Sequence, residues 1–429
     1  MTPELQNSST SSKPRIWEPF VAIAVAAAAL FLTGCMESTA SQSGSITETK
    51  AQCTETAVPN SYVIHWKDSS VSIARGWTRE EFEKEIFEPN KEKIRIVEQD
   101  QKVQISPLAT ETKAENVHAV NDVGASAASD DIWGQTMISA PDAWNAGIIG
   151  TGVVVAVVDS GVDITHPQLV GRLATNTGEI PANGIDDDGN GYIDDVHGWD
   201  FDGDQPIVSD SAGHGTHVSG IILAEHGAST VKGVAPGAKL LPLDFMNAAG
   251  QGNIGDAILA IKYAASQGAR VINASWGGSP CSQTLNRTIA EIEAQGVLFV
   301  AAAGNNGADI DTSPEYPAAF VLPNQITVGA STARDYTAGF SNFSYHLVHL
   351  FAPGSAIMST YPGSRLASLS GTSMAAPFVT GAAALIFSAH PNATVAQVRA
   401  ALLNSVDPGD FAASSKGRLD IKKALAAFR

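Results

Sequence analysis

Cysteine and positive charge are both scarce in this sequence. The 429 residues include only Cys35, Cys53 and Cys281, so the chain can form at most one disulfide, and spacing alone does not establish the pair. Only 26 basic residues stand against 44 acidic ones, which gives a net charge of −18 and supplies no basic patch. We therefore expect no nucleic acid partner. No internal repeat is visible, and the length fits one large domain plus an N-terminal extension.

A serine near the C-terminal end stands where a nucleophile would. Residues 371–377 read G-T-S-M-A-A-P and lead into an apolar, alanine-rich stretch that continues to residue 389. This pattern predicts Ser373 at the start of a buried helix, where unpaired N–H groups favour developing negative charge. A lone glycine-flanked serine is more often an ordinary helix cap. Other segments must therefore decide between the two interpretations.

Two further segments supply what a serine nucleophile needs. A branched apolar run at 153–158 is typical of a strand buried on both faces, and it ends at Asp159. His214 lies between two glycines and opens another apolar helical stretch. A serine hydroxyl is a weak nucleophile until an imidazole takes its proton, and a carboxylate must orient that imidazole. The three residues together predict a nucleophile, a base and its carboxylate. No such histidine segment accompanies Cys281, which disfavours a cysteine nucleophile.

Three sequence blocks resemble the signature blocks of the subtilisin-like serine peptidases. They are D-S-G-V-D at 159–163, H-G-T-H-V-S-G at 214–220 and G-T-S-M-A-A-P at 371–377, in the order found in that family. The resemblance covers residues 131–429 and implies a serine endopeptidase that hydrolyses peptide bonds through an acyl-enzyme, with Asp159, His214 and Ser373 as the triad. A catalytically silent peptide-binding protein and an esterase with the same triad are the alternatives.

A fourth block bears on the oxyanion of the tetrahedral intermediate. Residues 302–307 read A-A-G-N-N-G after an apolar strand. They resemble the family segment whose asparagine amide donates to the oxyanion, and this assigns the role to Asn305, with the backbone N–H of Ser373 as second donor. In isolation, Asn305 would be an ordinary turn residue.

Glycine-lined segments resemble the family's peptide-binding groove. Residues 275–278 read S-W-G-G and follow a predicted strand, and a G-Q-G turn begins at Gly250. Main-chain pairing with an extended peptide gives affinity, and side-chain pockets give selectivity. The turn at 250–252 is equally explained as a glycine-rich surface turn. The resemblance implies substrate binding by Ser275, Trp276, Gly277, Gly278 and Gly250.

Strands and helices alternate through the catalytic region. We expect strands near 153–158, 239–244, 270–275, 297–302 and 325–329, and helices near 255–267, 285–295, 372–389, 394–405 and 420–428. Alternation of this kind predicts an α/β fold, a doubly wound, mostly parallel sheet with helices on both faces. Active sites in such sheets lie at the carboxyl ends of strands, where Asp159, Ser275 and Asn305 fall.

The N-terminal extension begins with a signal-peptide pattern over residues 1–35. Lys13 and Arg15 precede an uncharged apolar run that ends in L-T-G-C. The last four residues resemble a bacterial lipobox, which implies that Cys35 carries a lipid membrane anchor. Cleavage nearby without lipidation and retention as a short signal anchor are the alternatives. All three place the enzyme outside the cytoplasm, secreted or membrane-anchored. If Cys35 is lipidated, Cys53 and Cys281 could form one bridge in that oxidising compartment.

The rest of the extension divides into three parts. Residues 36–57 are polar and read as a tether. Residues 58–106 contain two predicted strands around an amphipathic helix and resemble the inhibitory propeptide of the family, although the segment is shorter than usual. Residues 107–130 lack an obvious core and form a linker, where maturation cleavage is expected. The catalytic domain then covers 131–429.

An acidic insertion separates the segments of Asp159 and His214. Residues 173–231 contain no lysine or arginine, and the run D-D-D-G-N-G-Y-I-D-D resembles the first part of an EF-hand loop. The bidentate glutamate position of an EF-hand is His197 here, so a closed EF-hand is not expected, and a solvated acidic loop is the alternative. The pattern predicts structural calcium bound by Asp186, Asp188, Asn190, Tyr192 (through its carbonyl), Asp194 and Asp195, with Asp200 as an alternative to Asp195.

Overall fold

The computed structural model describes residues 56–105, 118–119, 132–206, 208–227, 231–279 and 281–428. The predicted signal peptide with Cys35, nearly all of the tether with Cys53, and most of the 107–130 linker lie outside these residues.

A nine-stranded sheet forms the centre of the protein, and all its neighbouring strands are parallel except β15 and β16. This confirms the predicted doubly wound α/β fold. The five strands expected from the sequence are all present, and the four additional ones lie towards the two sheet edges and have only two to four residues. In sheet order the strands are β15 (Asp407–Pro408), β16 (Gly417–Arg418), β12 (Leu350–Pro353), β11 (Gln325–Ser331), β10 (Leu298–Ala302), β9 (Val271–Ala274), β5 (Val154–Asp159), β7 (Lys239–Asp244) and β6 (Trp199–Asp200).

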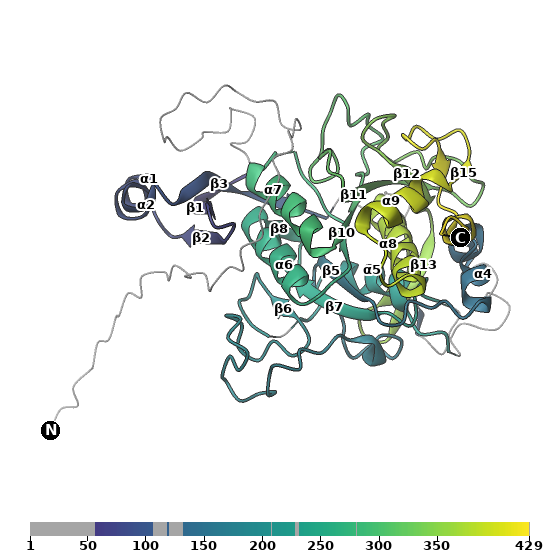
Figure 1. The fold of residues 1–429 in the computed structure, drawn as a ribbon, viewed down its shortest axis with the longest axis horizontal. Coiled ribbons are helices and arrows are strands. Elements are labelled where there is room, and N and C mark those ends of the chain that lie inside the picture. The colour runs from purple at the N-terminus through teal and green to yellow at the C-terminus, as the bar shows by residue number, and fades with distance from the viewer. Residues whose placement is uncertain are drawn as a thin grey trace.

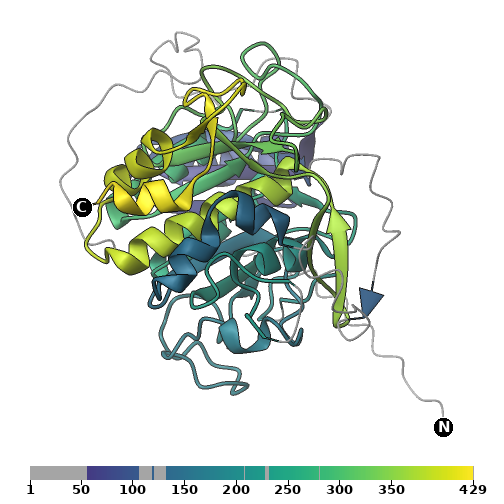
Figure 2. The same cartoon turned by 90° about the vertical axis from the view of Figure 1, so that its right-hand side faces the viewer.

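Helices cover both faces of the sheet, because successive strand residues point to opposite sides. Val155 and Val157 of β5 join one hydrophobic cluster, whereas Ala156 and Val158 join another. The yellow and yellow-green C-terminal helices stack over the first face in Figure 2. The first cluster includes residues of α5 (His214–Leu223), α8 (Thr372–Ala389), α9 (Val395–Asn404), α10 (Ile421–Ala426) and α4 (Ala140–Asn145), next to α3 (Trp133–Met137), and the second includes α6 (Ile254–Ser266) and α7 (Gln283–Glu291) with the 3₁₀ turn Ile292–Gln295.

Residues 56–105 fold as a separate small unit, which we call the N-terminal module. Its three antiparallel strands are β1 (Ala57–Trp66), β2 (Val71–Arg75) and β3 (Ile94–Gln104). A helical segment connects β2 to β3: α1 (Arg79–Phe82), a π-helical turn (Glu83–Phe87) and α2 (Glu88–Asn90). Its Phe82 and Ile86 side chains pack with Tyr62 and Val97 of the strands. Figure 1 shows the module in purple beside α6 and α7.

A third, small sheet supports helix α5. Strands β13 (Ile357–Tyr361) and β14 (Arg365–Leu369) form a hairpin, and β4 (His118–Ala119) pairs with β14. Strand β13 packs along α5, where the Ser359 hydroxyl donates to the His217 carbonyl at 2.7 Å and the Thr360 hydroxyl to the Thr216 carbonyl at 2.7 Å. A 3₁₀ turn at Val170–Arg172 lies in the acidic insertion.

Helix α8 is long and apolar enough to cross a membrane by length and composition alone, but 89% of the apolar window is buried inside the protein. It is the central core helix that begins at the predicted nucleophile.

Candidate active site

Asp159 and His214 meet at the carboxyl edge of the central sheet. Asp159 ends β5, and His214 opens α5, which packs against that strand. The His214 Nδ1 lies 2.7 Å from Asp159 Oδ1, and both side chains are buried. The backbone N–H of Ser160 also donates to Asp159 Oδ1 at 2.8 Å. The carboxylate is thus placed to fix the imidazole tautomer in which Nδ1 carries the proton and Nε2 accepts one.

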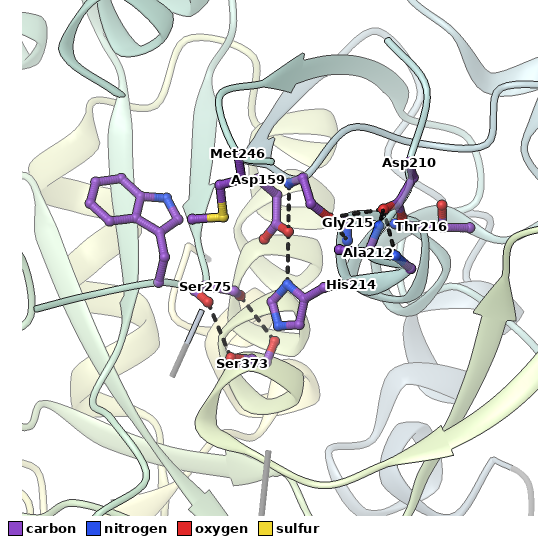
Figure 3. A network of polar contacts seen from close by, with 12 residues as sticks. Asp159, Asp210, Ala212, His214, Gly215, Thr216, Met246, Ser275 and Ser373 are labelled. Carbon is purple, nitrogen blue, oxygen red and sulfur yellow. Dashed lines mark hydrogen bonds and ion pairs between the residues drawn. The ribbon is translucent and has the colours of Figure 1, made fainter. Parts of the chain in front are cut away.

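Ser373 lies on the other side of the imidazole, in the first turn of α8 (Figure 3). Its hydroxyl donates to the Ser275 carbonyl at 3.1 Å, and the Ser275 hydroxyl donates to the Ser373 carbonyl at 3.0 Å. Within the described residues, His214 Nε2 is buried and makes no hydrogen bond. The expected serine–imidazole bond is therefore not formed. A serine hydroxyl rotates readily, and catalytic hydrogen bonds often tighten only when substrate binds.

Asn305 follows β10 and lies against the start of α8. Its side-chain oxygen accepts hydrogen bonds from the Thr372 N–H at 2.8 Å and from the Thr372 hydroxyl at 2.9 Å. These bonds fix the orientation of the amide, since an asparagine oxygen that accepts leaves the nitrogen as the donor. The amide nitrogen stands 3.1 Å from the position that a Cβ on Gly371 would take. A donor thus lies beside the start of α8, where the predicted nucleophile stands.

The end of β3 occupies the groove that the glycine segments were predicted to form. Gln104 and Gly277 exchange two backbone hydrogen bonds, at 3.0 and 3.2 Å. On the other side, β3 pairs antiparallel with β8 (Gln251–Asn253), and the Ile105 N–H donates to the Gly250 carbonyl at 2.9 Å. An extended chain therefore lies between β8 and the segment of Gly277 in the catalytic domain, as in β-augmentation.

Gly278 and Trp276, which were also predicted to contact substrate, contact other parts of the enzyme in this structure. Gly278 exchanges backbone hydrogen bonds with Tyr316, at 2.7 and 2.9 Å, and makes none with β3. Trp276 is fully buried, its indole N–H donates to the Val158 carbonyl at 2.9 Å, and its ring packs edge-on against Phe245. The indole therefore belongs to the core that supports the groove.

Burial shifts two titratable groups close to the pair. Asp244 is opposite Asp159 in the β5–β7 register, and burial, aided by the carboxylates of Asp200, Asp210 and Asp159, raises its pKa to about 8. Burial also lowers the pKa of His217 to about 3, although its Nε2 faces the Ala367 and Ile357 carbonyls. A neutral His217 fits a structural role inside α5 and the β13–β14 hairpin.

Comparison with known proteins identifies this arrangement. The sequence profile of the subtilase family matches residues 150–420. Subtilisin Savinase of Lederbergia lenta is 38% identical over 273 residues, which are 64% of this chain and 90% of that protein. Thermitase of Thermoactinomyces vulgaris is 37% identical over 296 residues, which are 68% of this chain and 95% of that protein. The chain belongs to the subtilase family. It is a serine endopeptidase with the Asp-His-Ser triad typical of that family.

A solved structure extends the likeness to most of the chain. Fervidolysin of Fervidobacterium pennivorans, a keratinolytic enzyme related to subtilisin, aligns with a TM-score of 0.69 at 26% identity. The alignment covers 87% of this subtilase and 62% of the fervidolysin chain. Residues 150–420, which the subtilase profile matches, make up less than 87% of the chain. The structural match to fervidolysin therefore extends beyond the region that the profile covers.

The carboxylates predicted to bind calcium fall into two groups in this subtilase. Asp186 accepts from the N–H groups of Asn190 and Gly191, and Asp194 accepts from those of Asn183 and Gly184. Both carboxylates therefore close turns of their own loop. Asp188 and Asp195 form the second group together with Glu179, and one carboxylate oxygen from each of the three lies within 4.8 Å of the other two.

Neighbouring polar groups surround this second group, which we call the carboxylate cluster. Asn176 and Asn190 each donate to both Asp188 and Asp195, at 2.7–3.1 Å, and the Tyr263 hydroxyl donates to Asp195 at 2.6 Å. The Tyr192 ring packs edge-on against Trp199, Phe201 and Tyr263. Glu179 was not predicted, because it precedes the D-D-D-G-N-G run and no spacing rule includes it.

Cys281 is disulfide-bonded. It immediately precedes Ser282, the N-cap of α7, and its partner lies outside the described residues.

Proposed function

We propose that Ser373 is the nucleophile, His214 its general base and Asp159 the carboxylate that orients the imidazole. The 2.7 Å contact between His214 and Asp159, beside the helix start that carries Ser373, is the observation on which this assignment depends. His214 Nε2 takes the hydroxyl proton as Ser373 Oγ attacks the peptide carbonyl. The imidazolium then returns the proton to the departing amine, and water hydrolyses the acyl-enzyme by the same proton transfers in reverse.

Asn305 and the backbone N–H of Ser373 donate to the oxyanion in this scheme. Such donors contribute because they are fixed before charge develops, and the Thr372 bonds hold the Asn305 amide in that way. The groove between Gly250 and Gly277 binds the substrate main chain.

A matched pair of serine variants on α8 tests the nucleophile. Ser373→Ala is expected to abolish peptide hydrolysis, whereas Ser388→Ala, near the exposed end of the same helix, should leave kcat/KM within twofold of the parent. Peptide hydrolysis at the parent rate in folded Ser373→Ala would contradict the assignment.

We further propose that the N-terminal module inhibits the enzyme as a propeptide. Its β3 strand fills the substrate groove, and two of its carboxylates meet the N-termini of α6 and α7. Asp100 accepts from the Gly255 N–H at 2.9 Å, and Glu98 accepts from the N–H groups of Gln283 and Thr284 at 3.1 Å and from the Ser282 hydroxyl. Burial raises the pKa of both carboxyls. Helix N-termini favour negative charge, which supports docking at this position.

The disulfide of Cys281 bears on whether the module stays covalently attached to the enzyme. The other two cysteines, Cys35 and Cys53, both precede the module in the sequence, and we propose Cys53 as the partner. Cleavage in the 107–130 linker would then leave the module attached, and a tethered inhibitor rebinds at an effective concentration of roughly millimolar. On a gel, the cleaved enzyme should separate into two chains only after reduction. Separation without reductant would contradict the tether.

We propose that the carboxylate cluster binds structural calcium. Three converging carboxylates provide the hard oxygen ligands that calcium prefers. A bound ion would neutralise the repulsion between Glu179, Asp188 and Asp195. Chelation is expected to lower the melting temperature of the parent.

We also propose that the enzyme acts outside the cytoplasm, anchored by a lipid on Cys35. Mass spectrometry of the mature N-terminus would detect both the lipid and the loss of residues 1–34. An unmodified N-terminus at another residue would contradict the anchor.

A further inference from the structure

Asp210 accepts four hydrogen bonds next to the Asp159–His214 pair, and no sequence motif assigns it a catalytic role. Its Oδ1 accepts from the Ser160 hydroxyl at 2.9 Å and from the N–H groups of Ala212 at 3.1 Å and Gly213 at 2.6 Å. Its Oδ2 accepts from the Thr216 N–H at 2.8 Å. Figure 3 shows this carboxylate on the side of the pair that faces away from Ser373.

The donors of these bonds lie close in sequence to Asp159 or to His214. Ser160 follows Asp159 in the chain, donates its N–H to the Asp159 carboxylate at 2.8 Å, and accepts the Gly215 N–H on its own hydroxyl at 3.1 Å. Gly213 and Thr216 flank His214 at the start of α5. The carboxylate therefore connects the segment that carries the acid to the segment that carries the base.

The helix start depends on this carboxylate for its capping. The N-cap residue of α5 is Gly213, at φ +85°, which has no side chain to accept the first N–H groups. Asp210 accepts the N–H of the N-cap residue Gly213 and that of Thr216 in the first turn, and a negative charge at this end of a helix is favourable.

The backbone that follows Asp159 packs closely against the backbone around His214. A Cβ at Gly215 would lie 2.1 Å from the Gly161 carbonyl oxygen, and one at Gly161 would lie 2.2 Å from that of Ser209. The two main chains are therefore in direct contact, and the Asp210 bonds set how they align. A small shift of α5 would change the 2.7 Å contact between His214 and Asp159.

We propose that Asp210 is a positioning residue of the acid–base pair: through Ser160 and the N-terminus of α5 it holds Asp159 and His214 in the alignment that proton transfer needs. It touches no substrate. The inference rests on the proposed triad, because misalignment matters only if His214 is the base. Reaction rates are sensitive to such misplacement even when the change lies outside the reacting atoms.

The test compares Asp210→Asn with Asp204→Asn, which removes the same charge from a nearby exposed position. Each variant is titrated with a fluorophosphonate to count competent sites, and kcat and KM are then measured per site. Asp210→Asn should lower kcat by about 10- to 100-fold, the effect of losing charge-assisted hydrogen bonds, with KM within threefold. Asp204→Asn should change neither parameter, and Asp210→Glu should recover part of kcat.

Ser160→Ala tests whether Asp210 acts through Ser160, and kcat per titrated site separates positioning from folding. Because it interrupts the same connection, the double variant Ser160→Ala/Asp210→Asn should lose no more than twice what Asp210→Asn alone loses. Independent, multiplicative losses would overturn the shared route. An unchanged kcat per titrated site, with only a lower melting temperature, would show that Asp210 is merely structural. Failure of the triad itself would appear instead as fluorophosphonate labelling that persists in Ser373→Ala.

Discussion

The Asp159–His214 pair and the turn-closing aspartates of the acidic insertion bind their partners over different distances along the sequence. In the catalytic centre, Asp159 binds His214 from 55 residues away, and Asp210 binds Ser160 from 50 residues away. In the insertion, Asp186 and Asp194 bind backbone N–H groups within 11 residues of themselves. Long-range pairs are set by the sheet, whereas local bonds are set by each turn. Motifs therefore predict the first region better than the second.

Replacing the carboxylate of the pair should give the largest effect. Asp159→Asn retains the shape but favours the wrong imidazole tautomer, and kcat should fall by about 10,000-fold. The measurement is kcat per active site, with the melting temperature as a control for folding. A loss smaller than tenfold would mean that the long-range contact does not orient the base.

Removing the side-chain oxyanion donor should give the second largest effect. Asn305→Ala is expected to reduce kcat by about 100- to 1,000-fold, the cost of removing the equivalent donor in subtilisin. KM should change little, since the donor acts on charge that appears only in the transition state. A rise in KM with unchanged kcat would place Asn305 in ground-state binding instead.

The insertion can be tested by separating its two groups of carboxylates. Asp195→Asn should abolish the calcium-dependent part of the stability, about 3–4 kcal/mol at 100 to 1,000 times the dissociation constant. Asp186→Asn, which alters a turn outside the carboxylate cluster, should retain a calcium response. Thermal unfolding with and without chelator measures both. Equal loss of the response in the two variants would favour the EF-hand-like ligand set of the sequence prediction.

The smallest effect concerns Asp244 and depends on pH. Its pKa in the folded protein is about 8, above the ordinary aspartate value, so the folded state holds a proton that the unfolded chain releases. The stability from this group is present at pH 4 and is lost as pH rises to 8. Asp244→Asn removes the titration and should raise the free energy of unfolding at pH 9 by roughly 1–3 kcal/mol relative to the parent. Urea unfolding at pH 4 and pH 9 measures the difference, and an equal effect at both would contradict it.

Much of the fold was predictable from the sequence. The parallel sheet and its five main strands were expected from apolar runs and alternation, and the structure confirms them. The β13–β14 hairpin was not expected, because its burial comes from packing on α5 and leaves no simple period in the sequence.

The candidate site was predictable where a motif fixes both the residue and its neighbours. Asp159, His214, Ser373 and Asn305 were named from such blocks, and the structure brings them to one edge of the sheet. The carboxylate of Glu179 and the pairing of Gly278 with Tyr316 depend on how loops fold back. The bond from the Ser160 hydroxyl to Asp210 likewise joins two segments whose approach no local pattern specifies.

The most direct test of the central claim is to locate the covalent adduct that a fluorophosphonate forms with the enzyme after the module has been cleaved and displaced. Mass spectrometry of the digested protein should find the adduct on Ser373 alone, and His214→Ala should prevent its formation. An adduct on any other serine, or undiminished labelling in His214→Ala, would contradict the account.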